Sequence, residues 1–208
     1  TAGHYPVVAL GDAIADLANG WSPKCLDRPV QGEEWGVLKL GAVSFGTFNA
    51  EENKALPAGL EPVPALQVLP GDWLISRANV TRLVGACALV KEAPPRLMLC
   101  DKIFRAVWRE DAPALPAYLD EVLKIPHLRQ QIEAALTGTS PTMKNISKPS
   151  LLALRIPLPP LDVQTNLVTA IDAARAEAAR LRAEAAQLSE QAQREIEAAL
   201  LGHPLADG

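Results

Sequence analysis

The chain has 208 residues, 49% of them hydrophobic and only 4% aromatic, so it is long enough for one domain with an appendage and a mainly aliphatic core. Its formal net charge of −4 argues against a nucleic-acid partner unless the basic residues are segregated along the chain. The three cysteines, Cys25, Cys87 and Cys100, are odd in number and lack CxxC spacing, which argues against a disulfide framework or a zinc site. With no visible signal peptide and no apolar run of about 20 residues, we expect a soluble, cytoplasmic protein without a membrane partner.

The region before Pro160 is rich in Pro and Gly and indicates a body of short strands with flanking helices. Strand-like apolar pieces are expected, in chain order, at residues 37–40, 42–43, 73–76, 83–90 and 102–107. Gly85 in the fourth piece suits a bulge or a close backbone approach. Residues 116–136 have helical spacing that Pro126 must break or kink. The predicted fold class is therefore α+β, with a small mixed sheet over residues 1–160.

The region after Pro160 contains almost no helix breaker until Gly202. Asp162 is the expected cap of a long helix over residues 161–202, with residues 203–208 as a tail. Its apolar positions recur at alternating gaps of four and three residues, which is typical of a coiled coil: Leu167, Ile171, Ala174, Ala178, Leu181, Ala185, Leu188 and Ala192. A lone helix cannot bury such a stripe, so we expect a partner helix, with a homodimer as one possibility.

The charges are segregated along the chain. Residues 73–109 carry seven basic residues and only two acids, Glu92 and Asp101, and residues 138–161 carry three basic residues and no acid. The long helix carries much of the negative charge. Clustered Lys and Arg are what phosphate binding requires, whereas the alternative interpretation is a set of surface charges paired with acids near the N-terminus.

Four segments carry a family resemblance when they are taken in order. They are Val37-Leu38-Lys39-Leu40-Gly41-Ala42-Val43-Ser44; Leu69-Pro70-Gly71-Asp72-Trp73-Leu74-Ile75-Ser76-Arg77-Ala78-Asn79; Leu83-Val84-Gly85 leading to Leu99-Cys100-Asp101-Lys102; and Gly138-Thr139-Ser140 through Ile156-Pro157-Leu158-Pro159-Pro160-Leu161 to Gln164. In this order they resemble the target-recognition domains of type I restriction–modification specificity subunits, over nearly the whole chain.

The resemblance implies a non-catalytic, sequence-specific DNA-binding subunit. Its recognition domain would read one half of a split site, and its helix would pack antiparallel on a second such helix. Double-stranded DNA, a modification methyltransferase subunit and, in a full complex, a restriction–translocase subunit are the implied partners. The usual subunit has two recognition domains and two helices, so a chain with one of each would be a half-subunit that homodimerises or a piece of a longer protein.

The candidate DNA contacts follow from donor chemistry and position. Ser76, Arg77 and Asn79, at the end of a predicted strand, are candidate DNA contacts, of which Arg77 suits guanine and Asn79 suits adenine. A polar, acid-free stretch with Thr139, Ser140, Lys144 and Asn145 could bind phosphates, and Lys39, Lys102 and Arg105 are further candidates. For each, the competing interpretation is a structural or solvated side chain. Gln164 is expected to have a structural role beside the Pro-rich junction.

No motif indicates chemistry of its own. The three histidines are scattered, and neither a phosphate-binding Gly loop nor the Asn-Pro-Pro-aromatic motif of adenine methyltransferases is present. We therefore expect no catalytic residues, no metal and no cofactor. The alternative function is a coiled-coil scaffold whose body binds another protein, for which the basic composition of the body would be unnecessary.

Overall fold

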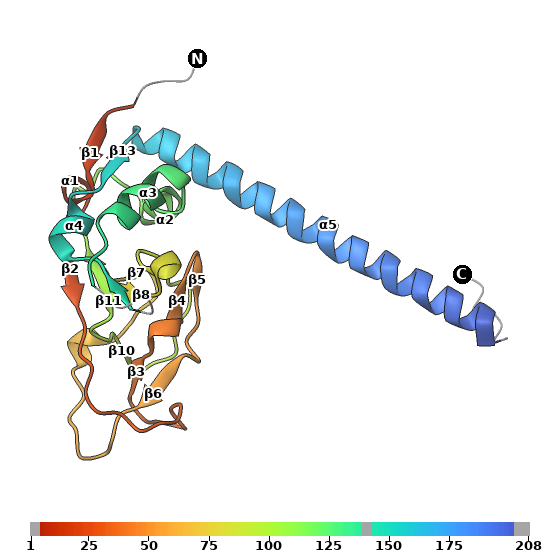
Figure 1. The fold of residues 1–208 in the computed structure, drawn as a ribbon, viewed down its shortest axis with the longest axis horizontal. Helices are drawn as coiled ribbons and strands as arrows, with labels where there is room; N and C mark the ends of the chain where they lie inside the picture. Colours follow the sequence, from red (N-terminus) through yellow and green to blue (C-terminus); the bar gives the residue numbers. More distant parts are fainter. Residues whose placement is uncertain (1–4, 139–142, 202–208) are drawn as a thin grey trace. The chain divides into compact units, whose positions relative to one another are not determined.

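The structure, a computed structural model, describes residues 5–138 and 143–201. The chain divides into two units between Thr165 and Asn166, a mixed α/β body and the greater part of one long helix (Figure 1). Within the described ranges, no helix has both the length and the apolar character needed to cross a membrane.

A four-stranded antiparallel sheet forms the centre of the body. Its order is β2 (Asp16–Asn19), β11 (Ile103–Val107), β7 (Trp73–Ser76) and β9 (Cys87–Leu89). All four residues of β7 are buried, so both faces of this strand are covered, as its unbroken apolar run suggests. The predicted strand at residues 73–76 is confirmed, and the one at residues 102–107 begins one residue later.

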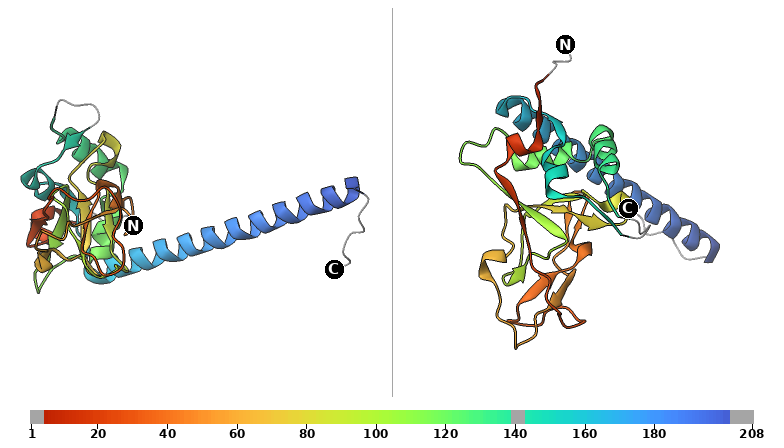
Figure 2. Two further views of the ribbon diagram at one scale, coloured as in Figure 1. Left: turned by 90° about the horizontal axis from the view of Figure 1, so that it is seen from below. Right: turned by 60° about the vertical axis from the view of Figure 1, so that its left-hand side comes forward.

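A second sheet has the order β10 (Leu97–Met98), β3 (Gly36–Leu38) and β6 (Asn53–Ala55). β3 pairs with β10 in parallel and with β6 in antiparallel orientation. Side chains from both sheets share one core cluster that includes Val37, Met98, Leu74 and Ile103. The views in Figures 1 and 2 place this sheet at one end of the body and the short helices at the other.

Three small strand pairs complete the β structure. β1 (Val7–Ala9) pairs with β13 (Arg155–Pro157), β4 (Val43–Ser44) with β5 (Thr47–Phe48), and β8 (Ala78–Asn79) with β12 (Lys144–Asn145), all antiparallel. Together with the helices they confirm the predicted α+β class.

The body's helices are short. They are α1 (Leu10–Ala13), α2 (Pro116–Val122), α3 (Pro126–Ala134) and α4 (Lys148–Leu152), with 3-10 turns η1 (Leu40–Ala42), η2 (Pro64–Leu66) and η3 (Thr81–Leu83). The helical region predicted at residues 116–136 is thus divided at Pro126, where the proline begins α3. Its missing N–H does no harm in the first turn of a helix.

Two predicted strands are shorter than expected. The strand at residues 37–40 ends at Leu38, since Leu40 already belongs to η1. The apolar run at residues 83–90 is a strand only at Cys87–Leu89. Gly85 interrupts it with φ +74°, and a Cβ there would lie 2.8 Å from Cδ1 of Ile132. The expected close backbone approach at Gly85 is therefore confirmed.

The long helix α5 (Leu161–Leu201) has 41 residues and begins where the Pro-rich stretch ends. The Gln164 amide donates to the Pro160 carbonyl at 3.0 Å, so the helix starts one residue before the expected cap, Asp162. Asp162 instead lies in the first turn, where a negative charge is favourable for the helix dipole. The expected structural role of Gln164 is confirmed, because its buried side chain bonds the Leu115 amide and the Pro113 and Pro159 carbonyls.

Candidate nucleic-acid interface

The strand pair β8–β12 brings two distant predicted segments together. Asn79 lies opposite Lys144 and Ala78 lies opposite Asn145. One residue further along, the Ile146 amide donates to the Arg77 carbonyl at 2.9 Å. The fold thus places Arg77 beside the acid-free stretch that follows α3.

The Arg77 guanidinium makes few contacts within the described part of the protein. It lies over the Phe104 ring, 5.3 Å from the ring centre, and its one hydrogen bond within residues 5–138 and 143–201 is a 3.5 Å contact with the Asp101 carbonyl. Its buried Nε has no hydrogen-bond partner among the described residues. The Arg77 amide donates to the Lys102 carbonyl at 2.9 Å, so the backbone at this position is fixed while most of the guanidinium's donors remain available.

Ser76 and Asn79 flank Arg77 but face inward. Ser76 is completely buried, and its hydroxyl has no partner in the described part of the chain. Asn79 is 8% exposed, and its Oδ1 accepts from the Val80 amide at 2.8 Å. In this conformation neither side chain can reach a duplex, so their arrangement favours support of the Arg77 backbone.

Lys144 and Asn145 are half-buried at the edge of the same surface. The Lys144 ammonium donates to the Gly138 carbonyl at 2.7 Å, and the main chain of Asn145 exchanges two hydrogen bonds with Thr137. These contacts join the two ends of the connection that contains Thr139 and Ser140, which lie outside the described residues.

Lys102 stands next to Arg77 and is paired with its neighbour Asp101, at 2.9 Å between Nζ and Oδ2. The other oxygen of Asp101 accepts from the Ser22 hydroxyl at 2.5 Å. Burial alone would raise the pKa of Asp101, but the Ser22 hydroxyl and the Lys102 ammonium outweigh it and hold that pKa below its usual value. Asp101 therefore stays ionised and neutralises part of the charge here.

Lys39 and Lys102 line one cleft, which has a volume of about 760 Å³. Lys24 and Lys54 line the same cleft. Neither was predicted, because the four lysines come from four separate segments and no spacing in the sequence connects them. Lys54 is the half-buried position between buried Asn53 and Ala55 in β6, an alternation of burial that the polarity of Asn-Lys-Ala does not show.

Arg105 belongs to the interior rather than to this surface. Its guanidinium donates to the carbonyls of Gln67 and Ala65, each at 2.8 Å, and pairs with Asp72 at 3.3 Å. The Asp72 carboxylate in turn accepts from the Leu69 amide. These contacts hold the turn before β7 and occupy the donors that DNA would need, which supports the structural interpretation.

Some basic residues of the segment 73–109 are held by partners within the described part of the protein, and others there are free to bind phosphates. Arg96 pairs with Glu33, Arg109 donates to the Gly11 carbonyl, and Lys102 pairs with Asp101. In the described ranges no carboxylate pairs with the exposed Arg82 or Lys91. Charge clustering predicted from the sequence therefore overstates the number of free cations.

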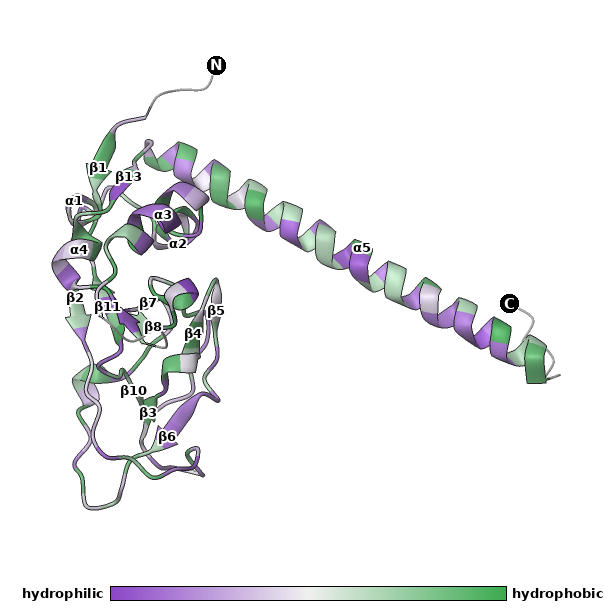
Figure 3. Cartoon of the chain, in the orientation of Figure 1, coloured by the Kyte–Doolittle hydropathy of each residue, from purple (hydrophilic) through white to green (hydrophobic). Residues whose placement is uncertain are grey.

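The predicted helix stripe is open along most of α5. Leu167, Leu181 and Leu188 are exposed, as are Ala174 and Ala185, and Ile171 and Ala178 are partly exposed. Figure 3 shows hydrophobic and hydrophilic residues interleaved along the helix. Charged neighbours pair within the helix, for example Arg180 with Glu177 and Glu184. The apolar stripe therefore remains available for a partner.

Comparison with characterised proteins identifies proteins that the chain is similar to. No protein-family model matches the chain. The specificity subunit of the type I restriction enzyme EcoEI from Escherichia coli is 34% identical over 165 residues, which cover 78% of the chain and 27% of that protein. The chain is related to the specificity subunits of type I restriction enzymes.

Solved structures of such subunits share the fold. The HsdS subunit from Thermoanaerobacter tengcongensis has a TM-score of 0.66 at 18% identity, covering 100% of this chain and 52% of the subunit. The S subunit from M. genitalium has a TM-score of 0.54 at 14% identity, covering 83% of this chain and 39% of that one. The chain thus spans about half or less of the length of each specificity subunit that it matches.

Proposed function

We propose that this chain is the DNA-reading part of a type I specificity subunit and that it reads one half of an interrupted site. The observation that carries the proposal is the main-chain juxtaposition of Arg77, Lys102, Lys144 and Asn145, which come from three separate segments, around β8–β12. We refer to these four residues as the reading surface.

Arg77 is the proposed base-reading residue of this surface. Its backbone is fixed by two strand-like hydrogen bonds, whereas its guanidinium keeps free donors in the fork arrangement that fits guanine O6 and N7. Lys102 and Lys144 are proposed phosphate contacts, since an ammonium is a compact point charge without a planar fork. Thr139 and Ser140, which lie outside the described residues, remain predicted phosphate contacts.

The helix α5 is the proposed assembly element. Its open apolar stripe suits a second helix of the same kind, and two copies of this chain would present two reading surfaces related by a two-fold axis. Such a homodimer would read a palindromic, interrupted site. We propose that the methyltransferase subunit, and in a full complex the restriction subunit, supply the catalysis, and that this chain supplies none.

The test is a methylation map. The chain is co-expressed with a type I modification methyltransferase subunit, and methylated adenines in the host genome are located by long-read sequencing. We expect one interrupted motif that is lost in the Arg77→Ala, Lys144→Ala double variant and kept in Lys91→Ala, which removes an exposed lysine elsewhere. Arg77→Lys keeps the charge but loses the fork, so it should relax one position of the motif.

Two outcomes would reject the proposal. Either no motif appears with the wild-type chain and its partner, or the motif survives the double variant unchanged. In the first case, a chain that also fails to bind duplex DNA at low salt would favour the scaffold function.

A further inference from the structure

The cleft that contains Lys39 and Lys102 gathers four lysines from four separate segments of the chain. Lys24 lies in the loop after β2, Lys39 follows β3, Lys54 lies in β6 and Lys102 precedes β11. All four ammonium-bearing side chains border one concavity of about 760 Å³. This lysine cleft therefore results from the tertiary fold and not from a basic stretch of sequence.

The lysine cleft carries a small positive excess. Lys39 pairs with Glu52 at 3.0 Å, Lys54 with Asp27 at 2.7 Å and Lys102 with Asp101 at 2.9 Å. No carboxylate pairs with Lys24 in the part of the chain that the structure describes. The three ion pairs are substantially exposed, and pairs of this kind contribute about 0–1 kcal/mol, so a stronger anion can replace the carboxylates.

The lining indicates the kind of anion. Among the described residues no aromatic ring lines the cleft, and the apolar part of the lining includes Pro23, Val37, Leu38 and Leu40. Stacking of an unpaired base on a protein needs an aromatic or guanidinium plane, which these residues do not offer. Lysine ammoniums on a concave surface instead suit the sugar–phosphate backbone, whose charge density exceeds that of an exposed carboxylate.

The cleft adjoins the reading surface. Lys102 belongs to both, and the Lys102 carbonyl accepts from the Arg77 amide at 2.9 Å. Asp101 also lines the cleft, and its main-chain carbonyl contacts the Arg77 guanidinium. A duplex bound at Arg77 would therefore continue over the cleft.

We propose that the lysine cleft binds the phosphodiester backbone of the duplex that the reading surface contacts, and that Lys24 and Lys54 are DNA-positioning residues. This inference rests on the proposed function, because it requires that the body bind duplex DNA. It adds a second contact region, one that holds the DNA without reading its sequence.

The first test is the salt dependence of duplex binding by the whole 208-residue chain. The plot of log Kobs against log salt has a negative slope, and each lost phosphate contact reduces the magnitude of that slope by about 1. We expect the Lys24→Ala, Lys54→Ala double variant to lose about 2 from the slope and to bind cognate and unrelated duplexes more weakly by the same factor. Lys91→Ala, with an exposed lysine outside this cleft, should leave the slope unchanged.

The second test uses Cys25, a half-buried free thiol in the cleft lining, as a reporter. Cys87 and Cys100 are buried, so iodoacetamide should label Cys25 first, and Cys25→Ser identifies its signal. We expect duplex DNA to slow this labelling at concentrations that saturate binding. Pyrophosphate at the same phosphate concentration should have little effect, since it cannot contact the cleft and the reading surface together and so binds far more weakly than a duplex.

The outcomes separate the two proposals. If the wild-type chain binds DNA but Cys25 stays reactive and the double variant keeps its slope, the cleft inference is wrong and the proposed function stands. If pyrophosphate protects Cys25 and DNA does not, the cleft is a small-anion site and the inference is also wrong. If the wild-type chain binds no duplex, both proposals fail.

Discussion

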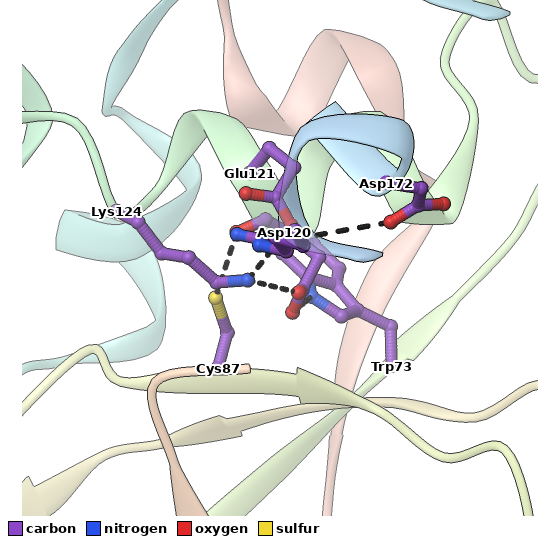
Figure 4. A network of polar contacts seen from close by, with 7 residues as sticks. Trp73, Cys87, Asp120, Glu121, Lys124 and Asp172 are labelled. Atoms are coloured by element: carbon purple, nitrogen blue, oxygen red, sulfur yellow. Dashed lines mark hydrogen bonds and ion pairs between the residues drawn. The ribbon is translucent and has the colours of Figure 1, made fainter. Parts of the chain in front are cut away.

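The Trp73 indole in β7 donates a hydrogen bond to the Asp120 carboxylate in α2, with 3.1 Å between Nε1 and Oδ1. The second carboxylate oxygen pairs with the Lys124 ammonium at 2.5 Å, and Lys124 also contacts Glu121 (Figure 4). Desolvation would lower the pKa of Lys124, but the Asp120 and Glu121 carboxylates raise it above its usual value. This network fixes α2 on β7, the strand that ends one residue before Arg77.

Replacing Asp120 with Ala should therefore destabilise the body. The change leaves a buried indole N–H without an acceptor and a mostly buried ammonium without its main partner, and loss of one partner of a buried pair costs about 3–5 kcal/mol. Because Glu121 still contacts Lys124, we expect the lower end of that range in urea unfolding. Asp120→Asn keeps an acceptor for Trp73 and should cost less, whereas equal losses in both variants would contradict this account.

A second prediction concerns Gln164, whose side chain satisfies three main-chain groups at the start of α5. Gln164→Ala leaves the Leu115 amide and the Pro113 and Pro159 carbonyls without this partner, at about 1–3 kcal/mol for each group that stays buried. Hydrogen exchange at the Leu115 amide should accelerate while exchange in β7 stays slow. Gln164→Glu keeps the acceptor for Leu115 but places a carboxylate oxygen against two carbonyl oxygens. Because these groups repel, the Glu variant should also be less stable than the wild-type chain. Unchanged exchange at Leu115 in the Ala variant would show that the Gln164 side chain does not protect this amide.

Arg105 offers a test of the structural interpretation of a basic residue. Arg105→Lys keeps the charge but cannot donate at once to Gln67, Ala65 and Asp72, so we expect a stability loss of about 1–3 kcal/mol. DNA affinity per folded molecule should stay unchanged below the unfolding transition. Normal stability with weakened DNA binding in this variant would show that Arg105 contacts DNA.

The elements that the sequence predicts well are those with an unambiguous local pattern. Residues 73–76 form an apolar run after a Pro-Gly turn, and residues 161–201 have a sustained helical period, so both appear at the expected places. The four-residue helix α1 and the two-residue strands β10 and β12 are too short to produce a period. Those strands form because tertiary packing places a partner strand beside them.

The candidate site shows the same division. Donor chemistry alone selects Arg77, Lys102 and Lys144, and the fold brings them together. Donor chemistry cannot separate Arg105 from them, because only the tertiary structure shows that its donors are occupied. Nor can it find Lys24 and Lys54, whose association depends on the packing of the loop after β2 against β6.

The exposed stripe of α5 predicts association through the helix. Leu181 and Leu188 are 50% and 61% exposed, and burying a leucine contributes about 1.5–3 kcal/mol. Leu181→Asp combined with Leu188→Asp should therefore convert a dimer into a monomer in analytical ultracentrifugation, with helix content in circular dichroism nearly retained. Arg194→Ala, on the face of the helix away from the stripe, is the matched control. A wild-type chain that is monomeric at all accessible concentrations would reject homodimerisation and leave another chain as the source of the second helix.

The pH dependence of Cys25 labelling tests the arrangement of the cleft itself, without DNA. Burial raises the pKa of the Cys25 thiol, and the Lys54 ammonium partly offsets this increase by stabilising the thiolate. The labelling rate follows the thiolate fraction, so the midpoint of the rate against pH should lie at a higher pH in the folded chain than in urea.

The raised pKa also affects stability. The protonated thiol favours the folded state at neutral pH, and this effect is lost as the pH rises through the pKa of the folded chain. Lys54→Ala should move the midpoint further upward, and Lys54→Arg should restore it. Identical midpoints in wild type and Lys54→Ala would show that Lys54 does not act on this thiol, and would undermine the cleft as a site where four cations converge.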